Sequence, residues 1–590
     1  MGKSLYNIFF IIALSVDFVL ADSDLDQIVI TPSKRTNTVF DSLNSTEIIT
    51  SREIQKYGFD SIDSLLNFSS SISIGSNGGP GQTKSIFLRG SESNHTKILI
   101  NGVELNPGTL GVPSIQHISV GMIDRIEIAK GSMSTLYGQN TIGGVINIIT
   151  KKNIEDANSF IVSSGRFNTN KINLYKKIEN GNNKLNFNYS EIRSDSYKAK
   201  VDSSKDHEYK NRNLSINYQY EIKKNLFELD YYESDGSTEY DSFGNNLIQD
   251  HKDKHIKMSL VQKNIDYKST YYYITKQNKI DQASVLATDY THTKINQFSI
   301  ENNYYDLFHT NSILGFSYID EALYELSYGT SFKISNNINE FFIQSEYIPF
   351  KQNIINTGIR LINHSRYGNY FTGNINIGYY INNNLMFTTG LGKSFRSPDG
   401  TDLFGYGGNA KLKPEESISA EVGFKYKLEK NNYFSLSIFN NEIRNLIESD
   451  GSIMQNLNKA RITGIEMVYK NTFNLIDYKI DYTYQEADDL TNDTLLSRRP
   501  RNKIVGKFSY GYDVNNILSL TMLGESVRDN SIYDYQRLGG YMIFNANYLH
   551  KKNDYIISFK INNIFDKKYR QAHNYNTEGA SIYISLATNF

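Results

Sequence analysis

Carboxylates gather in two stretches of the sequence, residues 195–208 and 235–253. A Ca²⁺ ion takes roughly six to eight oxygen ligands, and carboxylates on flexible segments can supply them. The two stretches offer Asp195, Asp202, Asp206, Glu208, Asp235, Glu239, Asp241, Asp250 and Asp253. A solvated acidic loop has the same composition, and a calcium cage would be weakened by the lysines among these carboxylates, Lys200, Lys205, Lys210 and Lys252. These residues alone leave both interpretations open.

Residues for other kinds of chemistry are missing or wrongly spaced. The chain has no Cys, which excludes a disulfide framework and Cys-ligated metals. The stretch "GLGKS" ends at Ser394, but a phosphate-binding loop would need Gly where Phe387 stands. The 10 His residues show no paired ligand spacing, and we interpret His95 and His117 as polar loop or turn groups. We therefore expect no enzyme activity, and the net charge of −1 argues against nucleic-acid binding.

The N-terminus has the pattern of a secretory signal. In "MGKSLYNIFFIIALSVDFVLA", Lys3 precedes an apolar stretch over residues 8–16, and small residues end at Ala21. We predict a signal peptide over residues 1–21; an apolar strand or helix end is the alternative. No later run approaches the roughly 18 apolar residues that a membrane helix needs. An exported chain of this kind is either soluble and secreted or a membrane β-barrel.

From about residue 156 to the end, the sequence repeats segments of alternating polarity that end in Asn, Asp, Gly or Lys turns. In "NLSINYQYE" (213–221), Leu214, Ile216 and Tyr218 alternate with polar residues. In the final segment, "ASIYISLATNF", Ile582, Ile584 and Leu586 fall on one side. Side chains alternate between the two faces of a strand, so each segment predicts a strand with one apolar face.

The number and length of these segments favour a membrane barrel over a soluble sandwich. We count about 22 segments, and a membrane strand needs roughly 9–11 residues, more than the 5–6 of a typical globular strand. The 44 Tyr and 32 Phe residues could form aromatic girdles, although the chain has no Trp. Short turns such as 179–182 contrast with long polar stretches at 192–211, 232–254 and 396–416. We therefore predict an antiparallel outer-membrane β-barrel over residues 156–590, with long loops on one side.

Residues 38–152 have a different pattern. Short helical patterns come first, in "STEIITSREIQKYGFDSIDSLLNFSS", and Gly-rich loops with brief apolar strands such as "KILING" and "RIEIAKG" follow. This mixture predicts a compact α+β domain ahead of the barrel. A large barrel encloses a lumen that is either open or plugged. We expect residues 38–152 to be the plug.

Several motifs resemble those of the TonB-dependent outer-membrane receptors. They include "NGGPGQTKSIFLRGSESNHTKILINGVELN" and "DRIEIAKGSMSTLYGQNTIGGVINIITKK" in the plug and "INNIFDKKYR" near the end of the chain. The resemblance covers essentially the whole mature chain, and it is closest to the cobalamin (vitamin B12) receptors of the family. It implies a transporter of cobalamin or a related corrinoid, driven by TonB of the inner-membrane energy-coupling complex. We expect a monomer surrounded by outer-membrane lipids.

The segment "DQIVITPS" looks like the TonB box of this family, followed by a linker that completes residues 22–37. The box would comprise Asp26, Gln27, Ile28, Val29, Ile30, Thr31, Pro32 and Ser33. A short extended segment of this kind can add as a strand to the sheet edge of a partner, and Pro32 would limit its continuation. A plain β-prone N-terminal arm is the alternative.

The resemblance also implies individual site residues. In cobalamin receptors, loops of this type form the floor of the ligand site, which would make Thr83, Ser85, Glu92, Leu110 and Gly111 ligand-facing. Arg498 in "TLLSRRP" matches a ligand-contacting Arg, whose guanidinium could donate to amides or phosphate. Cobalamin receptors order two outer loops with Ca²⁺, which the resemblance would place at Asp206, Glu208, Asp241 and Asp250. Ordinary loop residues and solvated charges are the alternative for each position.

Three other functions are open from the sequence. A siderophore or haem receptor would share the barrel, the plug and the TonB box, and a haem receptor would need a pair of axial His residues. A passive porin or adhesin would need neither the box nor the plug. A soluble all-β secreted protein would partition into water rather than detergent.

Overall fold

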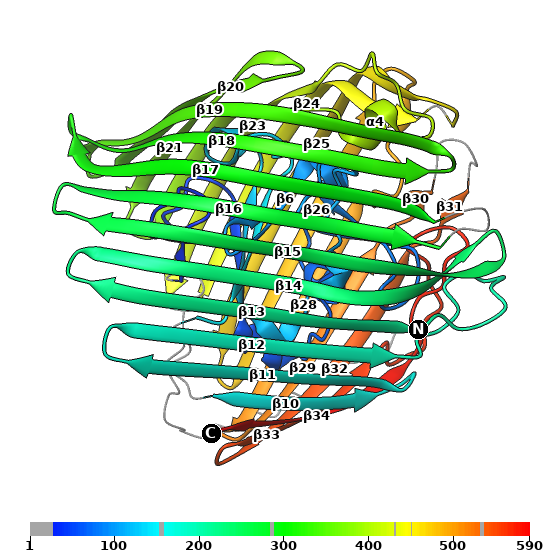
Figure 1. The fold of residues 1–590 in the computed structure, drawn as a ribbon. Coiled ribbons are helices and arrows are strands. Elements are labelled where there is room, and N and C mark those ends of the chain that lie inside the picture. Colours follow the sequence, from blue (N-terminus) through cyan, green and yellow to red (C-terminus); the bar gives the residue numbers. More distant parts are fainter. Residues whose placement is uncertain (1–26, 153–157, 284–287, 430–431, 450, 531–535) are drawn as a thin grey trace, which may run out of the picture.

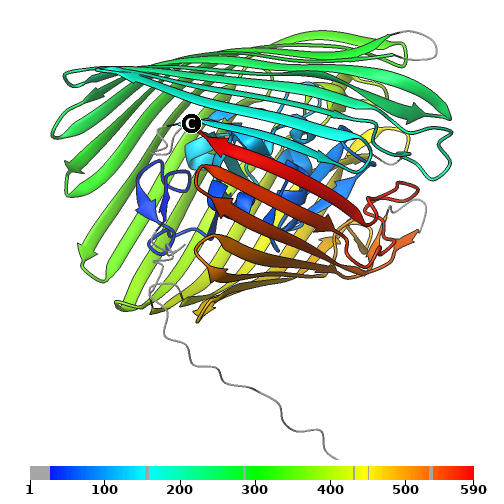
Figure 2. The same cartoon turned by 90° about the horizontal axis from the view of Figure 1, so that it is seen from below.

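A closed β-barrel encloses a smaller α+β domain in this protein (Figure 1, Figure 2). The structure is a computed structural model, and it describes residues 27–152, 158–283, 288–429, 432–449, 451–530 and 536–590. The predicted signal peptide (1–21) and Asp26 lie outside the described residues. Within the described residues, no helix is both long enough and apolar enough to cross a membrane.

The barrel strands follow chain order, and each pairs antiparallel with the next. In the described part of the chain, 22 strands form the wall, as the sequence predicted. They are β10 (Ser159–Gly165), β11 (Thr169–Asn180), β12 (Asn183–Ser194), β13 (Tyr209–Ile222), β14 (Asn225–Ser242), β15 (Asn245–Lys263), β16 (Tyr267–Gln282), β17 (Asp289–Leu307), β18 (Thr310–Ser327), β19 (Thr330–Phe350), β20 (Asn353–His364), β21 (Gly368–Asn382), β22 (Leu385–Arg396), β23 (Glu415–Glu429), β24 (Asn432–Ser449), β25 (Met454–Phe473), β26 (Ile476–Asp489), β28 (Asn502–Asp513), β29 (Asn516–Glu525), β32 (Tyr541–Lys552), β33 (Tyr555–Asn562) and β34 (Ser581–Asn589). The first and last strands close the ring: Ser159 lies opposite Asn589, and Gly165 lies opposite Tyr583.

The barrel wall has its apolar face outside. In β34, Ile582 and Ile584 are each 50% exposed, whereas Ser581 is buried. In β13, Asn213, Ser215 and Asn217 are buried toward the interior. A soluble protein would have the opposite arrangement, since exposed apolar side chains are favourable only where lipid replaces water. The alternation read from the sequence is therefore that of a membrane barrel.

The two ends of the barrel differ in their connections. One end, here called the short-turn end, has tight connections such as 181–182 and 514–515. The other, the long-loop end, carries the connections 195–208, 397–414, 490–501, 526–540 and 563–580. Short strands β27 (Thr494–Leu495), β30 (Arg528–Asp529) and β31 (Arg537–Leu538) and the helix α4 (Gly400–Phe404) lie within these long connections.

The prediction of a long outer loop at residues 232–254 is wrong. These residues belong to β14 and β15, which stay paired up to the turn at 243–244, with Ser242 opposite Asn245. The sequence gives the impression of a loop because polar side chains are frequent on both faces of this hairpin toward its tip. Only the backbone ladder identifies it as sheet.

The plug is built around a five-stranded sheet. Its strand order is β3 (Thr46–Thr50), β8 (Ile123–Lys130), β9 (Gly144–Thr150), β6 (Thr96–Ile100) and β7 (Val103–Glu104), with β6 and β9 parallel. A hairpin of β4 (Ile72–Ser76) and β5 (Lys84–Leu88) stands beside it, together with the helices α1 (Ser51–Tyr57), α2 (Ile62–Asn67) and α3 (Ser134–Tyr137). Three short 3₁₀ turns complete the plug, η2 (Ser93–His95), η3 (Ile115–His117) and η4 (Val120–Met122).

Helix α1 shows how the sequence sets these elements. The Thr50 side chain accepts a hydrogen bond from the Glu53 amide at 3.2 Å and begins the helix, and Gly58, with φ of 69°, ends it. The apolar core of the plug contains Ile49, Leu65 and Ile126, and it continues onto the barrel wall at Val505, Leu523 and Ile543. The plug is therefore fixed to β28, β29 and β32 in part by apolar contact.

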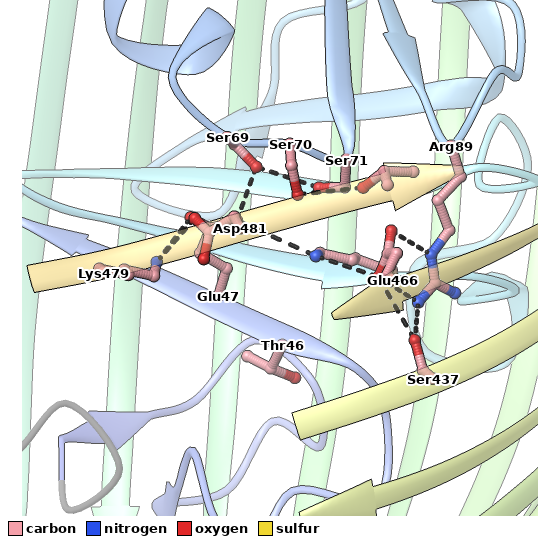
Figure 3. A network of polar contacts seen from close by, with 12 residues as sticks. Thr46, Glu47, Ser69, Ser70, Ser71, Arg89, Ser437, Glu466, Lys479 and Asp481 are labelled. Atoms are coloured by element: carbon pink, nitrogen blue, oxygen red, sulfur yellow. Dashed lines mark hydrogen bonds and ion pairs between the residues drawn. The ribbon is translucent and has the colours of Figure 1, made fainter. Parts of the chain in front are cut away.

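On another side, the plug is held by buried charges (Figure 3). The Arg89 guanidinium, just after β5, donates to Glu466 of β25 at 2.8 Å and to Glu421 of β23 at 2.8 Å. Lys130 at the end of β8 lies 3.3 Å from the same Glu466. Buried charges are stable only when they are paired in this way.

Glu47 of β3 joins this network from the plug side. Its carboxylate lies 3.3 Å from Lys479 of β26 and accepts from the Ser69 hydroxyl at 2.6 Å (Figure 3). Burial alone would raise the pKa of Glu47, but Lys479 and Lys130 lower the pKa to about 2. The carboxylate is therefore ionised at neutral pH and stabilises the docked plug.

We predict that Glu47→Gln weakens plug docking by on the order of 3 kcal/mol at pH 7, because it leaves Lys479 without one buried partner. The chain has no Cys, so a single introduced Cys can carry a spin label that reports urea-induced release of the plug. Because the folded pKa is depressed, the contribution is complete above about pH 4.5 and is lost as pH falls toward about 2.

The matched control is Glu442→Gln, which removes a carboxylate 2.8 Å from Lys459 in a partly exposed pair. It should leave the urea midpoint of the plug unchanged. An equal loss in both variants, or a loss in Glu47→Gln that persists at pH 2, would contradict the assignment.

Candidate functional site

A small polar cavity lies at the long-loop end, where the plug meets the outer connections. Its volume is about 110 Å³, and residues of the plug, of the connection 195–208 and of β14–β16 line it, among them Asn77, Thr83, Lys200, Tyr240 and Asp241. The structure thus places Thr83, predicted to face a ligand, and Asp241, predicted to bind a metal, on one cavity.

The β4–β5 hairpin brings two more predicted residues together. Ser85 of β5 lies opposite Gly75 of β4. A side chain at Gly75 would begin 3.5 Å from Ser85 Cβ and 3.8 Å from Arg498 Cδ. Arg498 reaches this position from the connection 490–501, where its φ is 65° and its amide donates to the Asp529 carbonyl at 2.7 Å. Ser85 and Arg498 therefore lie close together, beside the Phe87 ring, although 412 residues separate them in the chain.

Glu92 has a partner that the sequence interpretation missed. The Arg499 guanidinium forms an ion pair with the Glu92 carboxylate and donates to the Gly90 carbonyl at 2.9 Å. It also lies 4.6 Å from the centre of the Phe87 ring. The only feature of the sequence that pointed to Arg499 is its place as the second Arg of "SRRP". No neighbouring residue indicates that its side chain contacts the plug.

Leu110 and Gly111 lie in a plug loop that an outer connection covers. The amides of Gly400 and Thr401, at the start of α4, donate to the carbonyls of Gly108 and Thr109, each at 2.9 Å. Gly111 is buried, and a side chain there would begin 2.7 Å from an Asp399 oxygen. These backbone bonds hold the connection 397–414 down on the plug.

Arg396 anchors this covering connection. Its buried guanidinium lies 2.8 Å from Asp399, 2.5 Å from Asp402 and 3.2 Å from Glu415. Glu415 also contacts Nε2 of the plug residue His95 at 2.8 Å. One buried arginine therefore ties the connection to the end of β22, to β23 and, through Glu415, to the plug.

The four predicted metal-binding carboxylates do not converge. Asp241 lies 3.2 Å from Lys200 and accepts from the Ser203 hydroxyl at 2.9 Å, while Glu208 lies 3.0 Å from Lys210. Asp206 and Asp250 are exposed. In the part of the chain that the structure describes, no three His, Asp or Glu side chains are arranged to hold a metal ion. Lysine ammonium groups stand beside two of the four carboxylates, Asp241 and Glu208, and calcium binding stays a prediction.

The predicted TonB box is held against the plug at the short-turn end. Ile28–Val29 forms the strand β1, which pairs with β2 (Asn37–Thr38). Beyond β1, a Glu127 carboxylate oxygen accepts from the amides of Ile30 at 2.9 Å and Thr31 at 2.8 Å. Only Ile28–Val29 of the segment is a strand, because residues 31–34 form a turn, and the backbone of residues 28–31 already has hydrogen-bond partners within the chain.

A large cavity separates part of the plug from the barrel wall. Its volume is about 2880 Å³, and its lining extends from the short turn at 514–515 to the plug loop 78–81, along β10–β12 and β32–β34. Asp60, between α1 and α2, spans this gap and lies 3.0 Å from Lys560 and 3.7 Å from Lys171. The plug therefore fills the lumen incompletely.

Comparisons with known proteins agree with this architecture. The family model described as "TonB dependent receptor-like, beta-barrel" matches residues 156–564, and the TonB-dependent receptor plug domain matches residues 38–145. The vitamin B12 transporter BtuB of Vibrio vulnificus (strain YJ016) is 24% identical over 96% of this chain and 94% of its own length.

Two solved structures have a similar fold. The siderophore receptor PirA of Acinetobacter baumannii has a TM-score of 0.81 at 16% identity, covering 92% of this chain and 98% of its own. The ferric-catecholate import receptor Fiu of E. coli K12 has a TM-score of 0.80 at 15% identity, covering 96% and 100%. At these identities, the similarity establishes the fold alone.

We predict that Arg396→Ala releases the connection 397–414 from the plug, because it leaves Asp399, Asp402 and Glu415 without their buried cation. The amides of Gly400 and Thr401 should then exchange with deuterium at least about tenfold faster, as expected for local opening. Mass spectrometry of peptides from this connection measures the exchange.

Arg461→Ala is the matched control, since this half-exposed arginine pairs with Glu442 at 3.1 Å away from the plug. It should leave the exchange of both amides unchanged. Protection of Gly400 and Thr401 that survives in Arg396→Ala would show that the backbone bonds hold without the arginine.

Proposed function

The chain belongs to the TonB-dependent receptors, and we propose from this premise that it imports cobalamin or a closely related corrinoid across the outer membrane. The observation that carries the proposal is the meeting of Ser85 and Arg498 at Gly75. The resemblance to cobalamin receptors assigned both residues to the ligand, and distant parts of the chain bring them to one surface at the outer end of the plug.

The chemistry of this surface suits a large ligand with amides and a phosphate. The Arg498 guanidinium can donate several hydrogen bonds in a planar fork, and the Ser85 hydroxyl can donate or accept. Gly75 itself is buried against the Phe87 ring, so the half-buried side chains of Ser85 and Arg498 are the groups that a ligand would contact here. Thr83 and the residues of the adjoining cavity extend the polar surface.

Ligand entry requires the outer connections to move. The cavity of about 110 Å³ is smaller than the roughly 300–1,000 Å³ of typical small-molecule sites. The connection 195–208 borders it through Lys200, whose ammonium is held by Asp241 at 3.2 Å. We infer that this connection lifts to admit ligand, and that Ca²⁺, if it binds, replaces Lys200 beside Asp241.

TonB would drive the transport step from the short-turn end. A strand of the partner can pair with the box only after the bonds to β2 and to Glu127 break. Glu127 is fully buried, so its release exposes a charge to water at the moment the box leaves. In this proposal Glu127 sets how readily the box becomes available.

A ferric siderophore is the alternative ligand, and the adjacent Arg498 and Arg499 are the observation that favours it. Two guanidinium groups near one surface would attract an anionic complex. Arg499 is, however, already paired with Glu92. For haem, the plug residues His95 and His117 are both buried, and their ring nitrogens contact Glu415 and Tyr209.

We predict that the detergent-purified protein binds cyanocobalamin and that Arg498→Ala weakens this binding at least about tenfold, because a charged hydrogen bond is lost. Equilibrium binding is measured with and without Ca²⁺, with haem and a ferric siderophore as competitors. Arg501→Ala is the control, an exposed arginine of the same connection. Displacement by the siderophore but not by corrinoids would overturn the choice of ligand.

We predict that deleting residues 26–33 leaves ligand binding intact and abolishes uptake into cells.

We also predict that Glu127→Gln increases capture of the ligand-free receptor by the periplasmic part of TonB, because the amides of Ile30 and Thr31 lose a charged hydrogen-bond acceptor. Glu53→Gln is the control, since this carboxylate contacts Lys507 instead of the box. Uptake that survives the deletion would indicate a passive pore.

A further inference from the structure

Basic side chains form a compact group on the outer surface of the barrel. Two adjacent rows cross β15, β16 and β17: in one, Lys252 lies opposite Lys279 and Lys279 opposite His292; in the other, Lys254 lies opposite Gln277 and Gln277 opposite Lys294. Neighbouring positions of such a lattice are roughly 5–7 Å apart. We call these six residues, Lys252, Lys254, Gln277, Lys279, His292 and Lys294, the basic patch.

The basic patch faces away from the lumen. The residues that alternate with it in the same strands, such as Asp253, Asn278 and Thr293, are buried toward the interior. Further along the same outer face lie Met258, Tyr273 and Phe298, which are 53%, 43% and 43% exposed.

The position of the patch fixes its depth. Lys254 precedes Met258 by four residues, and Lys294 precedes Phe298 by four residues, so each lysine backbone lies about 13 Å along its strand from that apolar residue, with Ile256 between Lys254 and Met258 on the same face. They lie on the side of the long-loop end, which is the outer side in this family. The patch therefore borders the apolar band on the side that faces the headgroups of the outer leaflet.

The charges of the patch are only partly balanced within the chain. Lys252 lies 3.3 Å from Glu233 and 3.9 Å from Asp235, and Glu233 stands directly opposite Lys254 in the ladder. His292 lies 2.7 Å from Asp281, and the Lys254 ammonium lies 5.3 Å from the centre of the Tyr231 ring. Within the described residues, Lys279 and Lys294 have neither a hydrogen-bond nor an ion-pair partner. Like charges directly opposite each other, as in Lys252 and Lys279, destabilise a sheet.

We propose that the basic patch binds the phosphorylated headgroup of a glycolipid in the outer leaflet of the outer membrane. Phosphate oxygens supply the missing partners of Lys279 and Lys294 and relieve the repulsion between Lys252 and Lys279. The acyl chains of the same molecule lie against Met258, Tyr273 and Phe298. This apolar continuation selects a membrane lipid over free phosphate, and the site is independent of the transported ligand.

The test uses the full-length protein in phosphatidylcholine vesicles that contain bisphosphorylated lipid A. After gentle detergent extraction, native mass spectrometry measures the lipid A that stays bound. The triple variant Lys254→Gln/Lys279→Gln/Lys294→Gln should bind lipid A at least about tenfold more weakly, since each lysine near a membrane surface contributes attraction to anionic lipid. Its barrel should retain the heat-dependent gel mobility of the folded parent.

The matched control is Lys223→Gln/Lys224→Gln/Lys552→Gln, which removes three exposed lysines at the short-turn end. It should bind lipid A like the parent. Equal binding by the triple variant would overturn the proposal. Phosphatidylglycerol bound as tightly as lipid A, or full displacement by millimolar inorganic phosphate, would overturn the assignment to a phosphorylated glycolipid.

Discussion

The continuous hydrogen-bond ladder of the barrel is the constraint on which the rest of the structure depends. Lipid offers no partner to a backbone N–H or C=O group, so a sheet that crosses a membrane is stable only when it closes on itself. Closure through β10 and β34 satisfies every strand on both edges. It also forces the apolar side chains outward and leaves the lumen with a polar wall of Asn, Ser and charged residues.

That polar wall determines how the plug can be held. An interior lined by polar groups cannot hold a domain mainly by apolar contact, and the apolar contacts between plug and wall are divided among separate clusters, the largest of which reaches Val505, Leu523 and Ile543. Elsewhere buried ion pairs connect the two parts, as at Arg89 and Glu466. Such contacts are specific in position, and water can replace each partner if the plug separates from the wall. The large cavity along β10–β12 shows that the docking is uneven around the ring.

The sequence predicts the barrel well because a membrane strand has a period of two over its whole length. β13 and β34 show the expected alternation, and the plug and barrel follow from the change in pattern near residue 156. The hairpin β14–β15 is not recognised as sheet from the sequence because beyond the apolar band its outer face is polar as well, so the alternation of apolar and polar residues that identifies a strand disappears. Contacts between distant segments leave no signal in the local sequence. The ion pair of Arg499 with Glu92 and the covering of Leu110 and Gly111 by the connection 397–414 both depend on how the outer connections fold back onto the plug.

The seam between β10 and β34 has a consequence for assembly. It joins residues 159–165 to residues 583–589, so the ring stays an open ribbon until residues 583–589 are in place. The plug precedes the seam in the chain. A folded domain cannot pass between the strands of a closed barrel, so the plug must already lie inside when β10 pairs with β34. A chain cut short by its final nine residues would thus lose far more than one strand: it would retain two unpaired edges in the membrane and a plug without a complete wall.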